Sequence, residues 1–368
     1  MYKSNLSHEA LLNLDDYERY AKSLLPKAYY DYYASGACDE VSLRLNREAY
    51  QQILLTPRVL RDISHVSLQT TLNNKTLSHP ICIAPTAFHG LAHEQAEVAT
   101  VLAANATQTY MTVSMMSNES LEKVAEIASQ PLWLQLYFLN NPDDTLSIVR
   151  RAEAAGYNAL VVTVDSQFLG KREIDYRNQF KLPEHLRPAN LDFHKNKINI
   201  SAGKEDLFVK KLTWTDIEWL KSQTSLPIWL KGILHPDDAH LALQAGVDGL
   251  IISNHGARQL DTAIPPILVL SQIAEVIAGQ IPIIIDGGIR RGTDVFKAIA
   301  LGANAIMLGR PILWGLAVAG SQGVEQVITI LCTELANAMA LCGFNTIQEI
   351  RTDGKFSCYI PTSRYYQG

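Results

Sequence analysis

The sequence predicts an α/β fold, and within that class a closed (β/α)8 barrel of the TIM type. Short apolar runs that each end in a polar or glycine-rich turn alternate with amphipathic stretches of helical period, a pattern typical of parallel strands joined by helical crossovers. Eight such runs occur, and eight is the strand number of this barrel. An open, doubly wound sheet is the alternative, and the regular count of eight favours the barrel.

The strands and helices of the barrel can be placed along the chain. The predicted strands are Ile81–Pro85, Tyr110–Ser114, Leu132–Tyr137, Ala159–Val164, Ile228–Lys231, Gly249–Ser253, Pro282–Asp286 and Ala305–Gly309. The predicted helices between them are Gln95–Thr107, Ser120–Ser129, Pro142–Ala155, Pro236–Ala245, Leu268–Ala278 and Gly292–Leu301. No linker divides the chain, so we expect a single domain over residues 1–368 with the barrel over 81–320.

Three further segments lie outside the barrel pattern. Residues 1–80 predict an N-terminal extension of three helices, Leu11–Ser23, Pro26–Ser35 and Glu40–Leu54, followed by a hairpin that turns at Asn73-Asn74. A long loop is expected after the fourth strand, between Val164 and Ile228, because this stretch is polar and broken by Pro183, Pro188 and Gly203; such a loop usually acts as a lid or is partly disordered. Residues 321–368 predict a helix, Val324–Leu341, and a tail.

Composition excludes several classes of function. Apolar residues make up 47% and charged residues 19%, so a large core can form. A net charge of -5 argues against nucleic acid or anionic lipid as a partner. The five cysteines are Cys38, Cys82, Cys332, Cys342 and Cys358; they form no CxxC pair, which favours free thiols over a metal site. No signal peptide is seen and the apolar runs are shorter than the roughly 20 residues that span a bilayer, so we expect a cytoplasmic protein.

Polar residues gather where the predicted strands end, which in such barrels is the catalytic face. They are Pro85-Thr86-Ala87, Ser114, Gln135 with Tyr137, Thr163 with Asp165, Lys231, Ser253 with His255, Asp286-Gly287-Gly288 and Gly309-Arg310. The last two strands are followed by glycines and by Arg290 and Arg310, and the loops after strands seven and eight commonly bind phosphate. We therefore expect a phosphate-bearing ligand there; plain turns with surface arginines are the alternative.

A candidate for proton transfer follows the sixth strand. His255 can exchange a proton near neutral pH, and Arg258, three residues later, could bind a carboxylate. Asp165 at the end of the fourth strand could stabilise a charged imidazole, and Arg172 could be a second carboxylate ligand or a solvated surface charge. Lys231 is expected to have a partner, because burying a lysine alone is costly.

These segments together resemble the FMN-dependent 2-hydroxy acid oxidase and dehydrogenase family, which includes glycolate oxidase, lactate oxidase and mandelate dehydrogenase. The stretches that carry the resemblance are Pro26–Ala37, Ala84–His93, Leu134–Tyr137, Thr163–Glu173, Leu230–Ile233, Ser253–Asp261, Asp286–Ala303 and the LGRP sequence ending at Pro311. The sequence SNHGARQLD followed by DGGIRRGTDVFKA is highly specific. The resemblance implies oxidation of a small L-2-hydroxy acid to the 2-keto acid, with reduced FMN passing its electrons to O2 to give H2O2.

The resemblance also implies a role for each site residue. The FMN ring would lie against Pro85, Thr86, Ala87, Ser114, Gln135, Thr163, Lys231 and Ser253, and its phosphate would lie against Asp286, Gly287, Gly288, Arg290, Gly309 and Arg310. Arg172 and Arg258 would hold the substrate carboxylate, Tyr32 and Tyr137 would offer hydroxyls, and His255 would act as the base, assisted by Asp165. No metal is implied, and the family suggests a homotetramer.

Two positions depart from the family and bear on the substrate. Met116 stands where glycolate oxidase has tryptophan and lactate oxidase has tyrosine, and Phe88 follows Ala87. A flexible apolar Met116 favours a substrate side chain larger than the hydrogen of glycolate, as in lactate or a larger aliphatic or aromatic acid; ordinary packing is the alternative for both residues. Competing functions are a quinone- or carrier-linked dehydrogenase, another FMN-dependent barrel enzyme such as an isomerase, and a non-catalytic flavin-binding protein.

Overall fold

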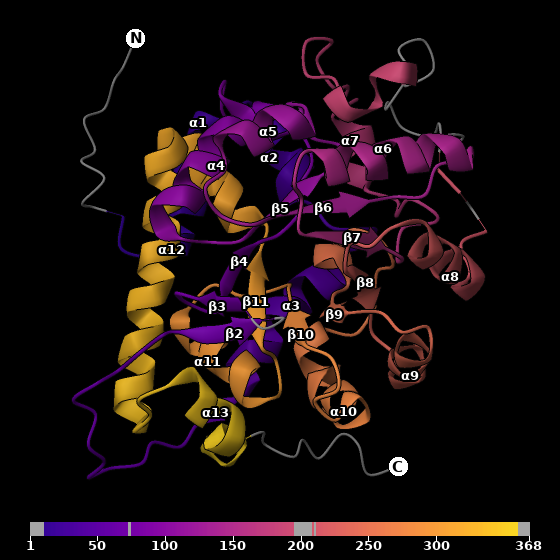
Figure 1. Cartoon of the computed structure of the whole chain (residues 1–368). Helices are drawn as coiled ribbons and strands as arrows, with labels where there is room; N and C mark the ends of the chain where they lie inside the picture. Colours follow the sequence, from indigo (N-terminus) through magenta and orange to yellow (C-terminus); the bar gives the residue numbers. More distant parts are fainter. Residues whose placement is uncertain (1–10, 73–74, 195–207, 210, 360–368) are drawn as a thin grey trace.

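Eight parallel strands close into a barrel in the computed structural model of the chain, which describes residues 11–72, 75–194, 208–209 and 211–359 (Figure 1). The strands are β4 (Ile81–Ile83), β5 (Met111–Ser114), β6 (Leu132–Leu136), β7 (Ala159–Thr163), β8 (Ile228–Ile233), β9 (Gly249–Ile252), β10 (Ile283–Ile285) and β11 (Ala305–Leu308). The barrel closes between β11 and β4, where Ile306 pairs with Ile81. All eight predicted strands and the predicted fold class are confirmed, with strand ends shifted by at most two residues.

Alternate residues of the strands fill the inside of the barrel. One buried cluster contains Cys82, Trp133, Val161, Trp229, Ile251, Ile284 and Met307, while the residues between them belong to the larger core shared with the helices. The Trp133 and Trp229 rings lie with centroids 4.7 Å apart. The antiparallel pair β2 (Thr70–Leu72) and β3 (Lys75–Leu77) contributes Leu72 and Leu77 to the same cluster. This predicted hairpin therefore packs against the barrel interior; its turn at Asn73-Asn74 lies outside the described residues.

Helices surround the barrel, and three helical segments between β7 and β8 differ from our expectation. They are α4 (Ala96–Thr107), α5 (Leu121–Ile127), α6 (Pro142–Ala154), α8 (Trp214–Gln223), α9 (Pro236–Gln244), α10 (Pro266–Ile277), α11 (Gly292–Ala300) and α12 (Arg310–Cys342). We expected only loop between Val164 and Ile228, and this was wrong for α8, for the short α7 (Glu173–Arg177) and for the 3-10 helix Ala189–His194. Thr213 and Asp216 form a capping box that starts α8. Residues 195–207 and 210 of this stretch lie outside the described residues.

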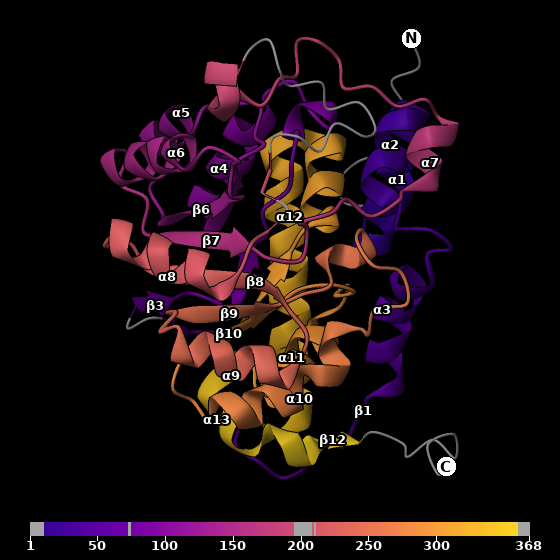
Figure 2. The ribbon, with the colours of Figure 1, turned by 90° about the vertical axis from the view of Figure 1, so that its right-hand side faces the viewer.

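The three predicted N-terminal helices stand at the edge of the barrel toward which β7 points (Figure 2). They are α1 (Leu14–Leu24), α2 (Lys27–Ala34) and α3 (Val41–Gln52). Helix α3 contacts the short helical turn His255–Ala257, and α2 contacts α7. An antiparallel pair, β1 (Leu54–Leu55) with β12 (Cys358–Tyr359), and helix α13 (Ile347–Asp353) were not predicted. The N-terminal extension thus lies over the face of the barrel at which the strands end.

Helix α12 corrects one expectation about membranes. Its 33 residues are long and apolar enough to cross a membrane by length and composition, although we expected no such segment. The helix is kinked at Ala319 and Gly320, where the backbone leaves helical geometry. It runs along the side of the barrel and packs against α1, α4 and α11 (Figure 1). Packing against the barrel gives its apolar residues a role in the protein core.

Candidate active site

Polar side chains take over the inward-facing positions where the strands reach the catalytic face. Successive side chains of a strand point to opposite sides, so a residue two positions after an interior one also points inward. The pairs of interior residue and polar residue are Trp133 and Gln135, Val161 and Thr163, Trp229 and Lys231, Ile251 and Ser253, and Ile284 and Asp286. All five polar side chains are buried. The barrel therefore ends in a buried polar floor.

Lys231 has two partners in this floor. Its Nζ donates a hydrogen bond to Ser253 Oγ at 2.8 Å and lies 3.2 Å from Asp286 Oδ2. Lys231 therefore has the partner that its burial requires, and the Asp286 carboxylate balances part of its charge. Asp286 Oδ1 has no hydrogen-bond partner among the described residues. The pair leaves one buried acceptor available to a ligand.

His255 and Asp165 lie together as expected. His255 Nδ1 is 2.9 Å from Asp165 Oδ1. Burial alone would raise the pKa of Asp165, but His255 and the charge of Lys231 outweigh it and lower that pKa. An ionised carboxylate can only accept, so Nδ1 carries the hydrogen and Nε2 is left free to take a proton. Gly232, with φ of +115°, gives Asp165 its space, because a Cβ there would lie 2.6 Å from Asp165 Cγ.

The backbone that carries His255 is strained. His255, Gly256 and Ala257 have φ of +58°, +60° and +61°, and left-handed conformations of non-glycine residues persist only when the surroundings hold them. Asn254 stabilises this turn, because its Oδ1 accepts a hydrogen bond from the Ala257 N–H at 3.1 Å. The same side chain exchanges two hydrogen bonds, of 2.9 and 2.8 Å, with Asn46 of α3. No local pattern around Asn46 indicates this role, so it was not predicted.

Arg258 and Arg310, which we predicted to bind ligands, also donate hydrogen bonds to the N-terminal extension. Arg258 Nη1 donates to the Tyr32 carbonyl at 2.7 Å and to the Ser35 carbonyl at 3.1 Å. Arg310 donates to the carbonyls of Tyr33 at 2.8 Å, Ser35 at 3.0 Å and Gly256 at 2.9 Å. These carbonyls include the C-terminal end of α2, where the helix dipole favours positive charge. Both arginines therefore have structural partners that we did not expect.

Half-buried arginines form a row of positive charge across the site. Burial lowers the pKa of Arg258, and the neighbouring charge of Arg172 lowers it further. Burial likewise lowers the pKa of Arg310 to about 9, with Arg258 and Arg290 adding to the effect. Such mutual repulsion in a buried site favours the binding of anions. One end of the row is Arg172 with Arg258, which comes three residues after His255 in the chain, and the other is Arg310 with Arg290, which follow β11 and β10.

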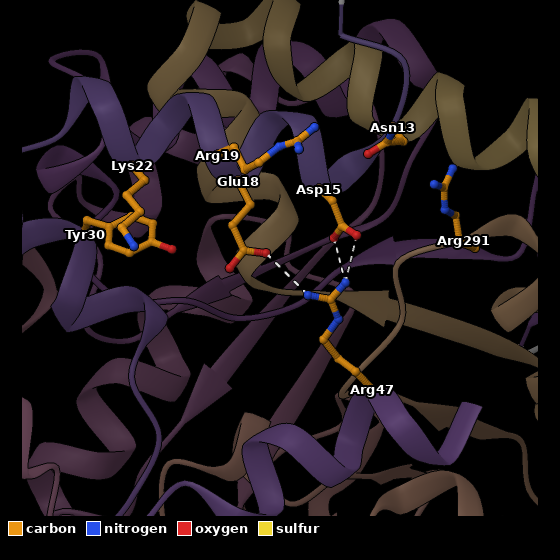
Figure 3. A pocket seen from close by; sticks show the side chains of 8 residues that line it. All are labelled: Asn13, Asp15, Glu18, Arg19, Lys22, Tyr30, Arg47 and Arg291. Carbon is orange, nitrogen blue, oxygen red and sulfur yellow. Dashed lines mark hydrogen bonds and ion pairs between the residues drawn. The ribbon is translucent and has the colours of Figure 1, made fainter. Parts of the chain in front are cut away.

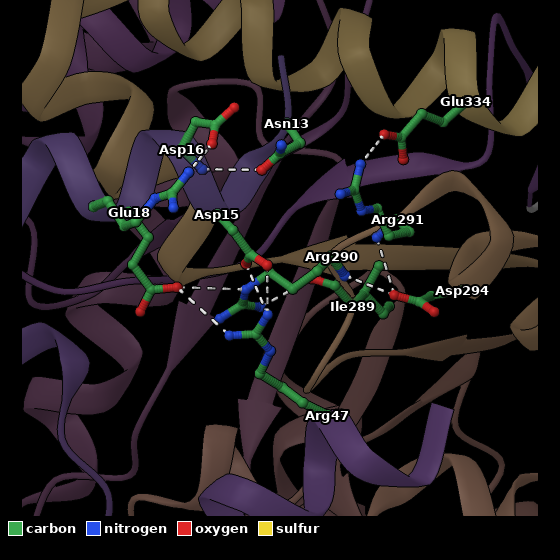
Figure 4. Close-up of polar contacts among 11 residues, drawn as sticks. Asn13, Asp15, Asp16, Glu18, Arg47, Ile289, Arg290, Arg291, Asp294 and Glu334 are labelled. Carbon is green, nitrogen blue, oxygen red and sulfur yellow. Dashed lines mark hydrogen bonds and ion pairs between the residues drawn. The ribbon is translucent and has the colours of Figure 1, made fainter. Parts of the chain in front are cut away.

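A close turn lies at the end of this row where the sequence predicts a phosphate. Gly287 and Gly288 have φ of +90° and +84°, and a Cβ on Gly288 would lie 2.0 Å from the Asn46 carbonyl oxygen. Arg290 Nη1 donates only to the neighbouring Ile289 carbonyl, and its Nε has no hydrogen-bond partner within the described ranges (Figure 4). Gln135 Nε2 is also buried without a partner. A flat ring with polar edges and a phosphate would satisfy these groups, so the residues fit FMN.

The remaining predicted residues lie around this floor. Ser114 Oγ donates to Gln135 Oε1 at 3.1 Å, and the Thr86 hydroxyl is hydrogen bonded to His89 Nε2 at 2.6 Å. Pro85, Ala87 and Gly309 are half-buried at the ends of β4 and β11. Met116 and Phe88 are buried. Arg172 is not solvated freely; its Nε donates to Asp175 Oδ2 at 2.8 Å.

Two aromatic residues of the stretch after β7 reach the site and were missed. The Phe180 ring stacks on Tyr32 with centroids 4.6 Å apart, and Phe208 meets Tyr137 edge-on at 5.1 Å. Arg258 lies 5.1 Å from the Tyr32 ring centroid. Burial, with the charge of Asp165, raises the pKa of Tyr137, which therefore keeps its hydrogen. Aromatic residues in an otherwise polar stretch were the available signal.

Comparison with known proteins agrees with this geometry. Residues 21–355 match the family described as FMN-dependent dehydrogenase. The chain is 45% identical to the peroxisomal (S)-2-hydroxyacid oxidase GLO4 of Arabidopsis thaliana over 93% of this chain and 95% of that protein. It is 46% identical to an L-lactate oxidase of Nostoc sp. over 93% and 97% of the two chains. A solved structure of mandelate oxidase superimposes with a TM-score of 0.88 at 39% identity, covering 92% and 97%. The chain therefore belongs to the FMN-dependent dehydrogenase family and is an FMN-dependent oxidoreductase related to (S)-2-hydroxyacid oxidases.

Proposed function

We propose that the protein oxidises an (S)-2-hydroxy acid with an apolar side chain, with His255 as the catalytic base. The observation that carries the proposal is the His255–Asp165 pair, 2.9 Å apart, with Arg258 three residues after His255 and the charge of Arg172 close to Arg258. A base next to a carboxylate-binding pair suits a substrate whose reacting carbon bears a carboxylate. The charge of Asp165 stabilises the imidazolium that forms when Nε2 takes the substrate proton.

Arg172 and Arg258 are assigned to the substrate carboxylate. Only Nη1 of Arg258 is hydrogen bonded within the described part of the chain, which leaves its Nη2 and Nε for a ligand. Arg172 keeps Nη1 and Nη2, because its contact with Asp175 uses Nε. Tyr32 and Tyr137 flank this position and offer hydroxyls to the substrate. The carboxylate and the base then fix the carbon between them.

FMN supplies the two-electron acceptor for this oxidation when it is bound. The residues assigned to its ring are Pro85, Thr86, Ala87, Ser114, Gln135, Thr163, Lys231 and Ser253. The residues assigned to its phosphate end are Gly287, Gly288, Arg290, Gly309 and Arg310, with Asp286 acting through Lys231. Lys231 places its charge within the polar floor, where it favours added negative charge. The unpartnered atoms Gln135 Nε2, Asp286 Oδ1 and Arg290 Nε support this assignment.

The apolar pocket residues support a lactate-like or larger substrate. Met116 is 8% exposed and Phe88 is 2% exposed, and Phe88 lies 6.3 Å from Tyr32 between ring centroids. A methionine adapts to side chains of different shape. The relatives include an L-lactate oxidase and a mandelate oxidase. We expect Met116→Trp to lower kcat/KM for lactate and mandelate more than for glycolate, as measured by anaerobic reduction of the bound FMN.

The assignment of His255 is tested by His255→Gln. The variant should keep bound FMN and lose about a hundredfold or more in the rate of its reduction by substrate, because general-base catalysis contributes roughly 10²–10⁴-fold. His240→Gln is the matched control, since His240 is exposed on α9. Reduction within tenfold of the wild-type rate in His255→Gln would contradict the assignment.

The electron acceptor is tested by admitting oxygen to the reduced enzyme. We expect rapid reoxidation with one H2O2 released per substrate oxidised. Slow reoxidation in oxygen with rapid reduction of a quinone or dye would instead identify a carrier-linked dehydrogenase. We also propose a homotetramer in the cytoplasm; light scattering of the purified enzyme and fluorescence imaging of the tagged protein test these two points.

A further inference from the structure

The carboxylate of Glu18 in α1 lies at the end of the arginine row that we assign to the FMN phosphate. The Arg290 side chain is 12% exposed, and Glu18 Oε2 lies 3.9 Å from its Nε (Figure 4). In the described portion of the chain, no other side-chain carboxylate lies within 4.0 Å of the Arg290 guanidinium. The carboxylate nearest to this half-buried arginine is therefore supplied by the N-terminal extension.

Glu18 acts on Arg290 through its charge. A distance of 3.9 Å is too long for a hydrogen bond, so the carboxylate does not fix the orientation of the guanidinium. Its second neighbour, Arg47 Nη1, is also distant, at 4.0 Å. Arg47 already has a close partner, because its Nη2 donates to both oxygens of Asp15 at 2.7 and 2.8 Å. Glu18 is thus shared loosely between two guanidinium groups.

The field of Glu18 reaches both arginines assigned to the phosphate. Burial lowers the pKa of Arg290 and of Arg310, and Glu18 opposes that shift in each case. On its outer side Glu18 lines a pocket of about 520 Å³ (Figure 3). The other lining residues are Asn13, Asp15, Arg19, Lys22, Tyr30, Arg47 and Arg291. Dissolved ions can therefore approach Glu18 and weaken its effect.

We propose that Glu18 is a built-in counter-anion of the phosphate site, which partly neutralises Arg290 and Arg310 in the protein without FMN and opposes the phosphate when FMN binds. The inference rests on the proposed function, which assigns the phosphate to these two arginines. A phosphate dianion and a carboxylate that share the same guanidinium repel each other. Glu18 thereby makes FMN binding weaker than the arginines alone would allow and stabilises the FMN-free protein.

The test compares two flavins that differ only in the phosphate. FMN and riboflavin are titrated into FMN-free wild type and Glu18→Gln at low ionic strength, and Kd is read from the quenching of flavin fluorescence. We expect Glu18→Gln to bind FMN on the order of tenfold more tightly, as expected for removal of one like charge near a partly buried site, with riboflavin Kd unchanged. The gain should shrink in 0.5 M NaCl, and the FMN-free variant should unfold at a lower temperature than FMN-free wild type.

Glu334→Gln is the matched control. Glu334 is 25% exposed against 22% for Glu18, and its Oε1 lies 2.7 Å from Nη1 of Arg291, the next arginine of the same turn. The Glu334→Gln variant removes a carboxylate that lies close to the site but is bound to Arg291. The FMN Kd of this variant should therefore change by less than about twofold. Glu18→Ala repeats the comparison if Glu18→Gln does not fold.

The outcomes separate this inference from the phosphate assignment. Arg290→Gln should abolish most of the preference for FMN over riboflavin; an unchanged preference would refute the assignment itself. If Arg290→Gln behaves as expected but Glu18→Gln binds FMN with unchanged or lower affinity, Glu18 is not an opposing anion. An equal change for FMN and riboflavin in Glu18→Gln would also overturn the inference, because it would show a general effect on the fold.

Discussion

Replacing Asn46 by leucine tests how the N-terminal extension holds the loop of His255. The Asn46 and Asn254 side chains are buried, at 2% and 4% exposure, and exchange two hydrogen bonds. Leucine has a similar volume, so the change removes the hydrogen bonds and leaves little cavity. Asn254 Nδ2 then keeps only a long contact of 3.4 Å with the Ile264 carbonyl. The substitution therefore leaves the buried side-chain amide of Asn254 without its short hydrogen bonds.

The expected loss in the free energy of unfolding follows from the unpaired amide of Asn254. A buried donor without a partner costs about 1–3 kcal/mol, and each lost neutral hydrogen bond is worth about 1 kcal/mol. We expect Asn46→Leu to lower the free energy of unfolding by about 2–4 kcal/mol. Asn254 also holds the left-handed turn from His255 to Ala257. Once Asn254 is loosened, His255 should lose its orientation, and FMN reduction by substrate should slow by about tenfold or more.

Two measurements separate the loop from general stability. Urea unfolding gives the free energy, and anaerobic stopped-flow gives the rate of FMN reduction. Asn105→Leu is the control, because Asn105 in α4 makes two hydrogen bonds, to Ile127 at 2.8 Å and from Ser129 at 2.7 Å, far from His255 in the chain. It should destabilise the protein and leave the reduction rate unchanged. A reduction rate for Asn46→Leu within twofold of wild type would refute the reasoning.

Three further predictions rest on single contacts. Gly288→Ala should weaken FMN binding more than about tenfold in a fluorescence titration, because its Cβ would lie 2.0 Å from the Asn46 carbonyl oxygen and its φ is +84°. Lys231→Met should lower the free energy of unfolding by about 3 kcal/mol in urea, since it leaves the buried Asp286 unpaired. The pKa of Asp165 is lowered in the folded state. The ionised carboxylate therefore stabilises the fold above about pH 4, and this stabilisation is lost as the pH falls through the folded pKa. The free energy of unfolding of Asp165→Asn, measured in urea at several pH values, should lack this loss at acidic pH.

The strands of the barrel were predictable because burial dictates their composition. A run such as Ile81–Ile83 is apolar on both faces, as a parallel strand between an interior and a helix layer must be. Helix α8 escaped prediction because only Ile217 and Leu220 are buried on it, which gives a weak period in the sequence. Its capping box, Thr213 with Asp216, was a readable signal that we did not use.

The candidate site divides in the same way. Side chains at strand ends follow from the strand register, so Lys231 and Gln135 could be placed from the sequence. Contacts that depend on how distant segments pack could not be placed. Asn46 meets Asn254 across 208 residues of chain, and Glu18 meets Arg290 from another helix of the extension. Neither pairing has a local pattern, because each depends on where α1 and α3 rest on the finished barrel.

The row of arginines explains why the extension and the barrel form one site. Buried guanidinium groups need acceptors whether or not a ligand is present. The C-terminal carbonyls of α2 supply them to Arg258 and Arg310, through Ser35 and its neighbours. The carbonyl oxygens accept some of the hydrogen bonds of these arginines, and Glu18 balances only part of the charge of Arg290 and Arg310. The positive charge that remains is available to two anions, a substrate carboxylate at one end and the FMN phosphate at the other. A fold that satisfied these arginines with close carboxylates would be more stable without ligands and would bind both anions less well.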